Sequence, residues 1–90
     1  MAKNKKINYS IIEEDFIKYY YKTYQKHITR DFFVCTPREL GLDSLDAVEM
    51  LLWAEEKYQI KTNNTDYSDR QTLQDFIDTV YNKIPQNKRG

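Results

Sequence analysis

Residues 43–58 read DSLDAVEMLLWAEEKY, and this stretch has the composition and the spacing of a helix. Asp43 is a good N-cap, because its side-chain oxygens can accept hydrogen bonds from the first free backbone N–H groups. Asp46 falls in the first turn, where a carboxylate is favoured by the positive end of the helix dipole. The sequence therefore predicts a helix from about Ser44 to Tyr58.

This predicted helix has two apolar faces. On a helical wheel, one sector is wide enough to pack on a core and contains Ala47, Met50, Leu51, Ala54 and Tyr58. A second sector, roughly opposite, contains Leu45, Val48 and Leu52, and it is flanked by Glu49, Glu55 and Glu56. Either the helix is central, or the second face is kept for a partner. The flanking carboxylates favour a partner with a basic, partly apolar surface.

Two further helices are predicted on either side of this one. Ser10-Ile11-Ile12-Glu13 has the pattern of a capping box, so a helix of four to five turns should begin near Ser10. Its apolar side would consist of Ile12, Phe16, Ile17, Tyr20, Tyr24 and Ile28. The last helix, 72–84, begins at a second capping box and has apolar side chains with helical spacing, namely Leu73, Phe76, Ile77, Val80 and Ile84.

The segments between the predicted helices are irregular. Residues 29–43 have no clean period, Pro37 disfavours helix at Thr36, and Gly41 indicates a turn, so a long loop is expected there. Residues 61–71 are polar and could contain one short helix at about 66–70. The expected fold is an all-α small helical bundle of three main helices plus a short third helix.

Length and composition agree with one small domain. The chain has 90 residues with two glycines and two prolines, too few for a turn-rich β-sandwich. We expect a single domain over 1–90 with a folded core of about 8–85 and frayed ends at 1–7 and 86–90. Cys35 is the only cysteine, so no internal disulfide can form. Without an apolar run long enough to span a bilayer or to serve as a secretory signal, we expect a cytoplasmic monomer.

The charges are separated along the chain although the net charge is zero. Residues 1–30 carry seven basic and three acidic side chains, a net charge of +4. Residues 31–60 carry two basic and seven acidic side chains, a net charge of −5. An acidic middle third predicts a partner with a basic surface.

The motif Leu40-Gly41-Leu42-Asp43-Ser44-Leu45-Asp46 resembles the signature of acyl carrier proteins, in which Asp-Ser-Leu follows Leu-Gly. The likeness continues through 47–58 and resumes at 72–77, so that 40–80 can be laid on the family pattern without a gap. The resemblance implies a phosphopantetheine-dependent carrier with a helical-bundle fold. The carrier would not be an enzyme itself.

If the resemblance holds, the hydroxyl of Ser44 is the attachment point of a 4′-phosphopantetheine arm taken from coenzyme A. The residues fit this role, since Ser44 would lie at a helix N-terminus, where N–H groups and the dipole favour a phosphate. Gly41 would let the preceding chain turn tightly and leave the hydroxyl accessible. Carried over from the family, the partner-binding positions are Asp43, Leu45, Asp46, Val48, Glu49, Leu52, Glu55 and Glu56.

The implied function is to carry acyl intermediates as thioesters for fatty acid or polyketide-type biosynthesis. The implied partners are a phosphopantetheinyl transferase and acyl-loading and acyl-processing enzymes with basic docking surfaces, with neither nucleic acid nor membrane insertion involved. Two alternatives remain open at this point. One is an aminoacyl or peptidyl carrier, and the other is a helical interaction module that is never modified.

Three features depart from the family pattern: the neutral net charge, the polar residues Thr62 and Arg70 where apolar ones are usual, and Trp53 where a small residue is common. Other residues were weighed and set aside as sites. Cys35 and His27 have no orienting partner in the sequence for nucleophilic catalysis. Residues 63–69 lack the glycine and glutamate of a calcium loop. We therefore expect neither a catalytic residue nor a metal site.

Overall fold

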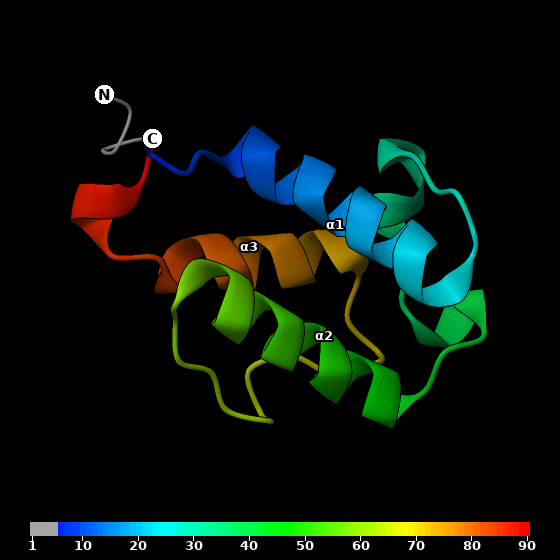
Figure 1. Ribbon diagram of the computed structural model, residues 1–90. Coiled ribbons are helices and arrows are strands. Elements are labelled where there is room, and N and C mark those ends of the chain that lie inside the picture. The colour runs from blue at the N-terminus through cyan, green and yellow to red at the C-terminus, as the bar shows by residue number, and fades with distance from the viewer. Residues whose placement is uncertain (1–5) are drawn as a thin grey trace.

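Three α-helices and three short 3₁₀ helices are present in residues 6–90, the part of the chain that this computed structural model describes (Figure 1). The α-helices are α1 (Tyr9–Tyr24), α2 (Ser44–Tyr58) and α3 (Leu73–Lys83). The 3₁₀ helices are η2 (Arg30–Val34), η3 (Arg38–Leu40) and η4 (Gln86–Lys88). Within residues 6–90 the only β-type pairing is an isolated bridge between Ile7 and Arg89. The predicted all-α class is confirmed.

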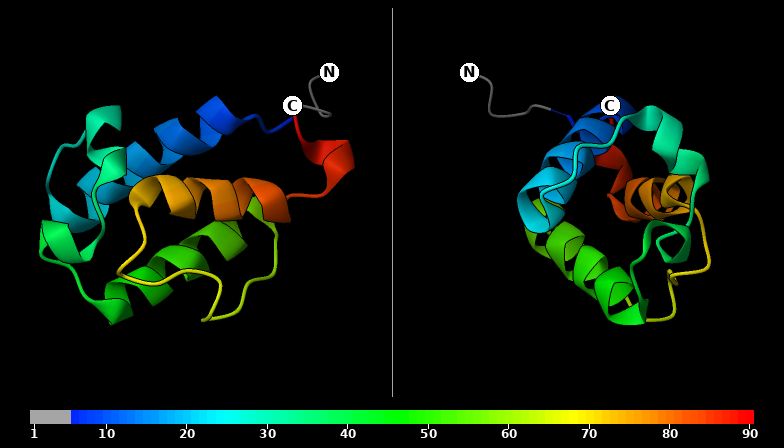
Figure 2. Two further views of the ribbon diagram at one scale, coloured as in Figure 1. Left: turned by 180° about the vertical axis from the view of Figure 1, so that it is seen from behind. Right: turned by 90° about the vertical axis from the view of Figure 1, so that its right-hand side faces the viewer.

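The three α-helices form a bundle in which α2 and α3 run in the same direction and both run antiparallel to α1 (Figures 1 and 2). Seen along the bundle in Figure 2, each α-helix occupies one corner of a triangle. Hydrogen bonds fix the antiparallel pair of α1 and α2 at both ends. The Tyr24 hydroxyl donates to Asp46 at 3.1 Å, and the Tyr58 hydroxyl donates to Asp15 at 2.7 Å. The side of α2 that faces α1 is thus set by specific polar contacts as well as by apolar packing.

The predicted start of α2 is confirmed in detail. The Asp43 carboxylate accepts hydrogen bonds from the backbone N–H groups of Leu45 and Asp46, and the Asp46 carboxylate accepts one from the N–H of Asp43. This reciprocal capping box satisfies donors that a helix end leaves without partners. At the other end, Gln59 adopts a left-handed conformation with φ of 57°, which ends the helix.

The start of α3 is confirmed in the same way. Thr72 is the N-cap, its hydroxyl accepts from the N–H of Asp75, and the Asp75 carboxylate accepts from the N–H of Thr72. The five apolar residues predicted for this helix face are all buried: Leu73, Phe76, Ile77, Val80 and Ile84.

The predicted start of α1 near Ser10 is confirmed to within one residue, but the predicted capping box of Ser10 and Glu13 does not form. Its N-cap is Asn8, whose side chain accepts a hydrogen bond from the N–H of Ile11 at 2.9 Å, so Ser10 lies inside the helix. Glu13 does not close a capping box because its carboxylate pairs with Arg30 at 2.9 Å. Asparagine caps helices as well as serine does.

The short helix expected at 66–70 does not form, which corrects the prediction. Residues 59–72 make turns whose side chains bond to nearby backbone, as when Asp66 accepts from the N–H of Asn63 at 2.7 Å. Tyr67 enters the core, and its hydroxyl donates to the carbonyls of Gln71 and Thr72. Local side-chain bonds of this kind compete with helical backbone bonds.

The loop between α1 and α2 contains η2 and η3 and is fastened to the start of α3. Of its apolar run, Phe33 is buried, whereas Phe32 and Val34 are exposed. The N–H of Leu73 donates to the carbonyl of Cys35 at 2.9 Å, and the N–H of Arg38 donates to the carbonyl of Asp69 at 3.1 Å. The loop is therefore held in place by long-range contacts.

Aromatic rings fill the centre of the bundle. Phe16 of α1 lies 5.2 Å from Phe76, 6.1 Å from Trp53 and 6.2 Å from Phe33, measured between ring centroids. Tyr67 packs edge-on against Phe76 at 5.3 Å. Such tilted and edge-to-face pairs add to the stabilisation that burial of the rings provides.

The two ends of the described chain are paired. The N–H of Ile7 donates to the carbonyl of Lys88, and the N–H of Gly90 donates to the carbonyl of Ile7, each at 2.8 Å. Residues 86–90 thus differ from the frayed end that the sequence predicts. The part of that prediction that concerns residues 1–5 lies outside the described residues.

Candidate functional site

Ser44 is the first residue of α2 and is exposed to solvent. The chain reaches it through Gly41, whose φ of 84° lies in the left-handed region that favours glycine. A Cβ at Gly41 would meet no atom within 4 Å, so the backbone conformation, and not crowding, is what favours glycine there. The sequence prediction that this hydroxyl lies at an open helix end is confirmed as geometry.

The charged surroundings of Ser44 are dominated by Asp43. Hydrogen bonds from the backbone N–H groups of Asp46 and Leu45 lower the pKa of the Asp43 carboxyl, so the ionised form is favoured. This carboxylate uses the N–H groups of Leu45 and Asp46, two of the donors that a phosphate could otherwise have bound. A phosphate on Ser44 would therefore depend on the helix dipole more than on a backbone cradle.

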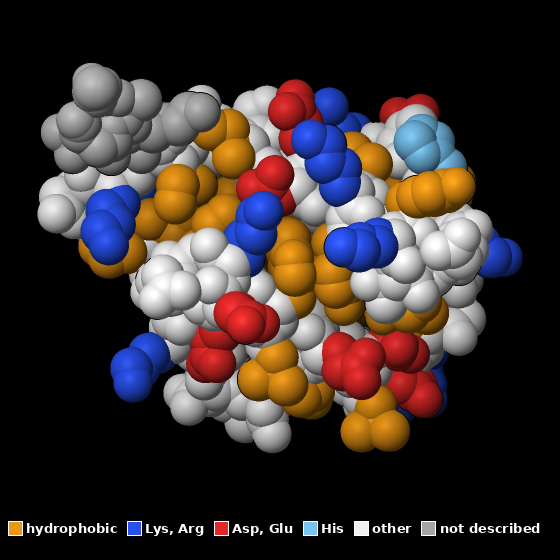
Figure 3. Space-filling model, viewed as in Figure 1, with side chains coloured by type: hydrophobic (Ala, Val, Ile, Leu, Met, Phe, Trp, Pro, Cys, Tyr) orange, Lys and Arg blue, Asp and Glu red, His pale blue; other side chains and the backbone are white. Residues whose placement is uncertain are grey.

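The second apolar face of α2 is exposed, as one of the two readings of the sequence predicts. Leu45 is 71% exposed and Leu52 is 54% exposed, while Val48 between them is half-buried. Glu49 and Glu56 are also exposed along this face. Figure 3 shows apolar side chains between acidic ones along the lower edge of the molecule, where α2 runs. The alternative that α2 is a central helix with both faces buried is excluded.

Three of the eight predicted partner-binding residues already accept hydrogen bonds inside the molecule, and one of them is Asp43, the N-cap of α2. Asp46 accepts hydrogen bonds from the N–H of Asp43 and from the Tyr24 hydroxyl. Glu55 accepts hydrogen bonds from the N–H and the hydroxyl of Thr62, at 2.7 and 3.2 Å. The most accessible part of the predicted face, which we call the docking strip, consists of Leu45, Val48, Glu49, Leu52 and Glu56.

A groove of about 370 Å³ lies between α1 and α2 and was not predicted from the sequence. Its middle is formed by Trp53 and Tyr19, whose rings stack at 4.7 Å with an angle of 24° between their planes. Burial raises the pKa of the Tyr19 hydroxyl. The remaining lining residues are charged: Asp15, Lys18, Lys22 and Lys57. The sequence singled out Trp53 as unusual, but the facing residues of α1 could not be paired with it from the sequence alone.

Across residues 6–90, no group of three or more His, Cys, Asp or Glu side chains is placed to hold a metal ion. None of the described helices is both long enough and apolar enough to cross a bilayer.

Comparison with known protein families matches residues 38–80 to the family described as the phosphopantetheine attachment site. This match confirms the predicted resemblance to acyl carrier proteins. The family carries 4′-phosphopantetheine covalently, and its carrier domains are not catalytic. The matched residues run from η3 through α2 to Val80 of α3. No solved structure matches the chain.

Proposed function

We propose, from the match of residues 38–80 to the phosphopantetheine attachment family, that Ser44 carries the arm and that its cargo is an acyl group. The observation that carries the proposal is the exposed hydroxyl of Ser44 at the start of a capped helix, inside the Asp-Ser-Leu motif. The chain has three serines, and neither Ser10 nor Ser68 lies in such a motif.

The modification itself is a transfer from coenzyme A. The Ser44 oxygen forms a phosphodiester with the phosphorus of the 4′-phosphopantetheine group, and the pyrophosphate bond of coenzyme A breaks. Adenosine 3′,5′-bisphosphate leaves, and the hydroxyl proton passes to the transferase or to solvent. Exposure of Ser44 supports this step, because a separate enzyme must reach the oxygen. The thiol at the end of the arm then carries cargo as a thioester.

The docking strip supports the proposal that partner enzymes approach along α2. Exposed leucines between carboxylates suit a surface that is both apolar and basic. The phosphopantetheinyl transferase and the acyl-loading enzyme would each meet the same strip in turn. Since these charges are exposed, their attraction is screened over about 8 Å at physiological ionic strength, so docking should weaken as salt is added.

The attachment proposal is tested by intact mass after incubation with coenzyme A and a phosphopantetheinyl transferase of broad specificity. We expect the wild type to gain one arm and Ser44→Ala to gain none. Ser10→Ala is the matched control, because Ser10 is also an exposed serine near a helix start, and this variant should be modified like the wild type. A modified Ser44→Ala protein, or an unmodified wild type, would contradict the proposal.

The nature of the cargo is tested on the modified protein. We propose fatty acid or polyketide-type acyl groups, which an acyl-transferring enzyme would load. An aminoacyl or peptidyl carrier would instead be loaded by an enzyme that first adenylates an amino acid. Loading by the adenylating class alone, measured as thioester formation on the intact protein, would overturn the acyl assignment and leave the attachment site standing.

A further inference from the structure

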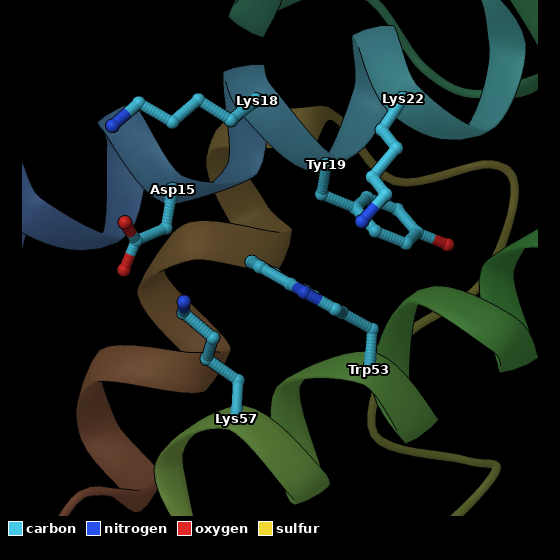
Figure 4. A pocket seen from close by; sticks show the side chains of 6 residues that line it. All are labelled: Asp15, Lys18, Tyr19, Lys22, Trp53 and Lys57. Carbon is cyan, nitrogen blue, oxygen red and sulfur yellow. The ribbon is translucent and has the colours of Figure 1, made fainter.

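The groove between α1 and α2 combines an apolar centre with excess positive charge. Three lysines and one aspartate line it, a net charge of +2, around the stacked rings of Trp53 and Tyr19. Figure 4 shows the ammonium groups of Lys22 and Lys57 on two sides of the Trp53 ring. Such a lining fits a short apolar chain that ends in a negative charge.

The lysines of the groove have no ion-pair partners among residues 6–90. The ion pairs found there use Arg30, Arg38 and Lys83 as the cations. The one carboxylate in the groove, Asp15, accepts a hydrogen bond from the buried Tyr58 hydroxyl at 2.7 Å. This contact, after burial, raises the pKa of Tyr58. The positive charge of Lys18, Lys22 and Lys57 is therefore not balanced by contacts within the fold.

The groove is within reach of an arm on Ser44. Trp53 follows Ser44 by nine residues on one helix, which is about 13 Å along the axis at 1.5 Å per residue and half a turn around it, so the arm would pass the start of α2 to enter the groove. The arm contains two amide units and is about as long as five extended residues, roughly 17 Å. Lys22 lies toward the same end of the α1–α2 pair as Ser44, since Tyr24 bonds to Asp46 there. Figure 3 shows the basic groove and the acidic edge of α2 on one face of the molecule.

From charge, shape and reach together, we propose that this groove binds the free carboxylate end of a short dicarboxylic acyl cargo carried on the arm of the same molecule. The carboxylate lies between Lys22 and Lys57, and the methylene groups lie against the edge of the Trp53–Tyr19 pair. This inference rests on the proposed function, because it needs the arm on Ser44. It goes further by assigning a class of cargo.

The test compares two cargoes of equal chain length on the carrier. The transferase can load Ser44 from succinyl-coenzyme A or from butyryl-coenzyme A, and intact mass confirms loading in each case. Trp53 is the only tryptophan in the chain, so its indole N–H gives one unambiguous cross-peak in a ¹H–¹⁵N spectrum. We expect succinyl cargo to shift this peak relative to butyryl cargo, and the difference to shrink in 1 M salt, where screening acts over about 3 Å.

Variants of the groove lysines test whether these side chains cause the difference in the Trp53 peak between the two cargoes. Lys22→Gln combined with Lys57→Gln should abolish the difference between the two cargoes. Lys26→Gln is the control, because Lys26 is an exposed lysine just beyond α1 that does not line the groove. Identical Trp53 peaks with both cargoes, or a difference that survives in the double variant, would overturn the proposal while the mass data still support attachment at Ser44.

One further experiment distinguishes binding of the tethered cargo from binding of a dissolved anion. Monomethyl succinate is titrated into protein that carries the arm without cargo. The proposal expects no shift of the Trp53 peak at concentrations up to those of the loaded protein. A matching shift from the free acid at that concentration would show a site for dissolved anions and overturn the assignment to the carrier's own cargo.

Discussion

Ser44 owes its position to the residues on both sides of it. Gly41 turns the chain with a positive φ, and the Asp43 carboxylate closes the helix start, so the hydroxyl follows directly on a fixed cap. Asp43 also places an ionised group next to the oxygen that would receive the arm. The aspartate therefore has a structural role that does not depend on partner binding.

At the residue scale, Asp66 gives a prediction about acid stability. A hydrogen bond from the Asn63 N–H and the Lys83 ammonium at 3.0 Å lower the pKa of the Asp66 carboxyl. The folded state thus favours the ionised form, and this stabilisation is present above the unfolded pKa of about 3.9. It is lost as the pH falls through the lower folded pKa. Asp66→Asn should be less stable than the wild type at pH 6. Between pH 6 and pH 2.5 its thermal unfolding midpoint should fall by less than that of the wild type.

Asp31→Asn serves as the control for this measurement, because Asp31 is exposed and takes part in none of the side-chain hydrogen bonds or ion pairs of residues 6–90. Its thermal midpoint should fall with pH in parallel with the wild type. If the thermal midpoints of Asp66→Asn and the wild type fall by the same amount on acidification, the bonds at Asp66 do not stabilise the fold as described.

At the element scale, α2 packs one face against the core and leaves the opposite face exposed, and two adjacent leucines lie on these different faces. Leu51 is 1% exposed and packs in the core, whereas Leu52 is 54% exposed. Leu51→Ala should lower the free energy of unfolding by about 3 kcal/mol, since it leaves a cavity. Leu52→Ala should change it by less than about 0.5 kcal/mol, as is usual for surface positions. Urea unfolding of both variants gives the comparison.

The same pair of variants tests the docking strip. Leu52→Ala should reduce kcat/KM of the transferase several-fold although the carrier remains as stable as the wild type. A stability loss in Leu52→Ala like that of Leu51→Ala would show that the strip belongs to the core. Unchanged transferase kinetics in a stable Leu52→Ala protein would remove the strip from the docking surface.

The elements that the sequence predicts well are those with local causes. The starts of α2 and α3 follow from capping boxes within four residues, and their buried faces follow from helical spacing. The helix α1 begins within one residue of its predicted start, but its N-cap is Asn8, and Glu13 pairs with Arg30 and does not close the predicted capping box. The sequence alone does not show that Glu13 pairs with a residue 17 positions away.

At the scale of the whole molecule, the features missed are those that join distant segments. The 29–43 loop is held by a hydrogen bond between the backbones of Cys35 and Leu73. The two ends are paired by a hydrogen bond between the backbones of Ile7 and Lys88. The 59–72 segment stays irregular because Tyr67 is buried against α3. In the candidate site, Ser44 and the docking strip lie on one helix and were predictable. The lysine-lined groove needed the packing of α1 on α2.

At this scale the molecule is an aromatic-cored bundle that presents Ser44 at a capped helix start, with the lysines of α1 next to the acidic α2. This arrangement explains how a chain without net charge can still present an acidic docking strip. A partner enzyme that approached α2, as proposed, would meet carboxylates, while the groove beside it has an excess of lysines. The proposed docking of partner enzymes and the proposed binding of cargo in the groove both require that the phosphopantetheine arm is attached to Ser44.

The most direct test is the mass of a single tryptic peptide from the protein after treatment with coenzyme A and the transferase. Cleavage after Arg38 and Lys57 releases residues 39–57, in which Ser44 is the only hydroxyl-bearing side chain. We predict that this peptide carries one phosphopantetheine group and that fragmentation places it on Ser44. An unmodified 39–57 peptide, or an arm found on any other peptide, would contradict the account.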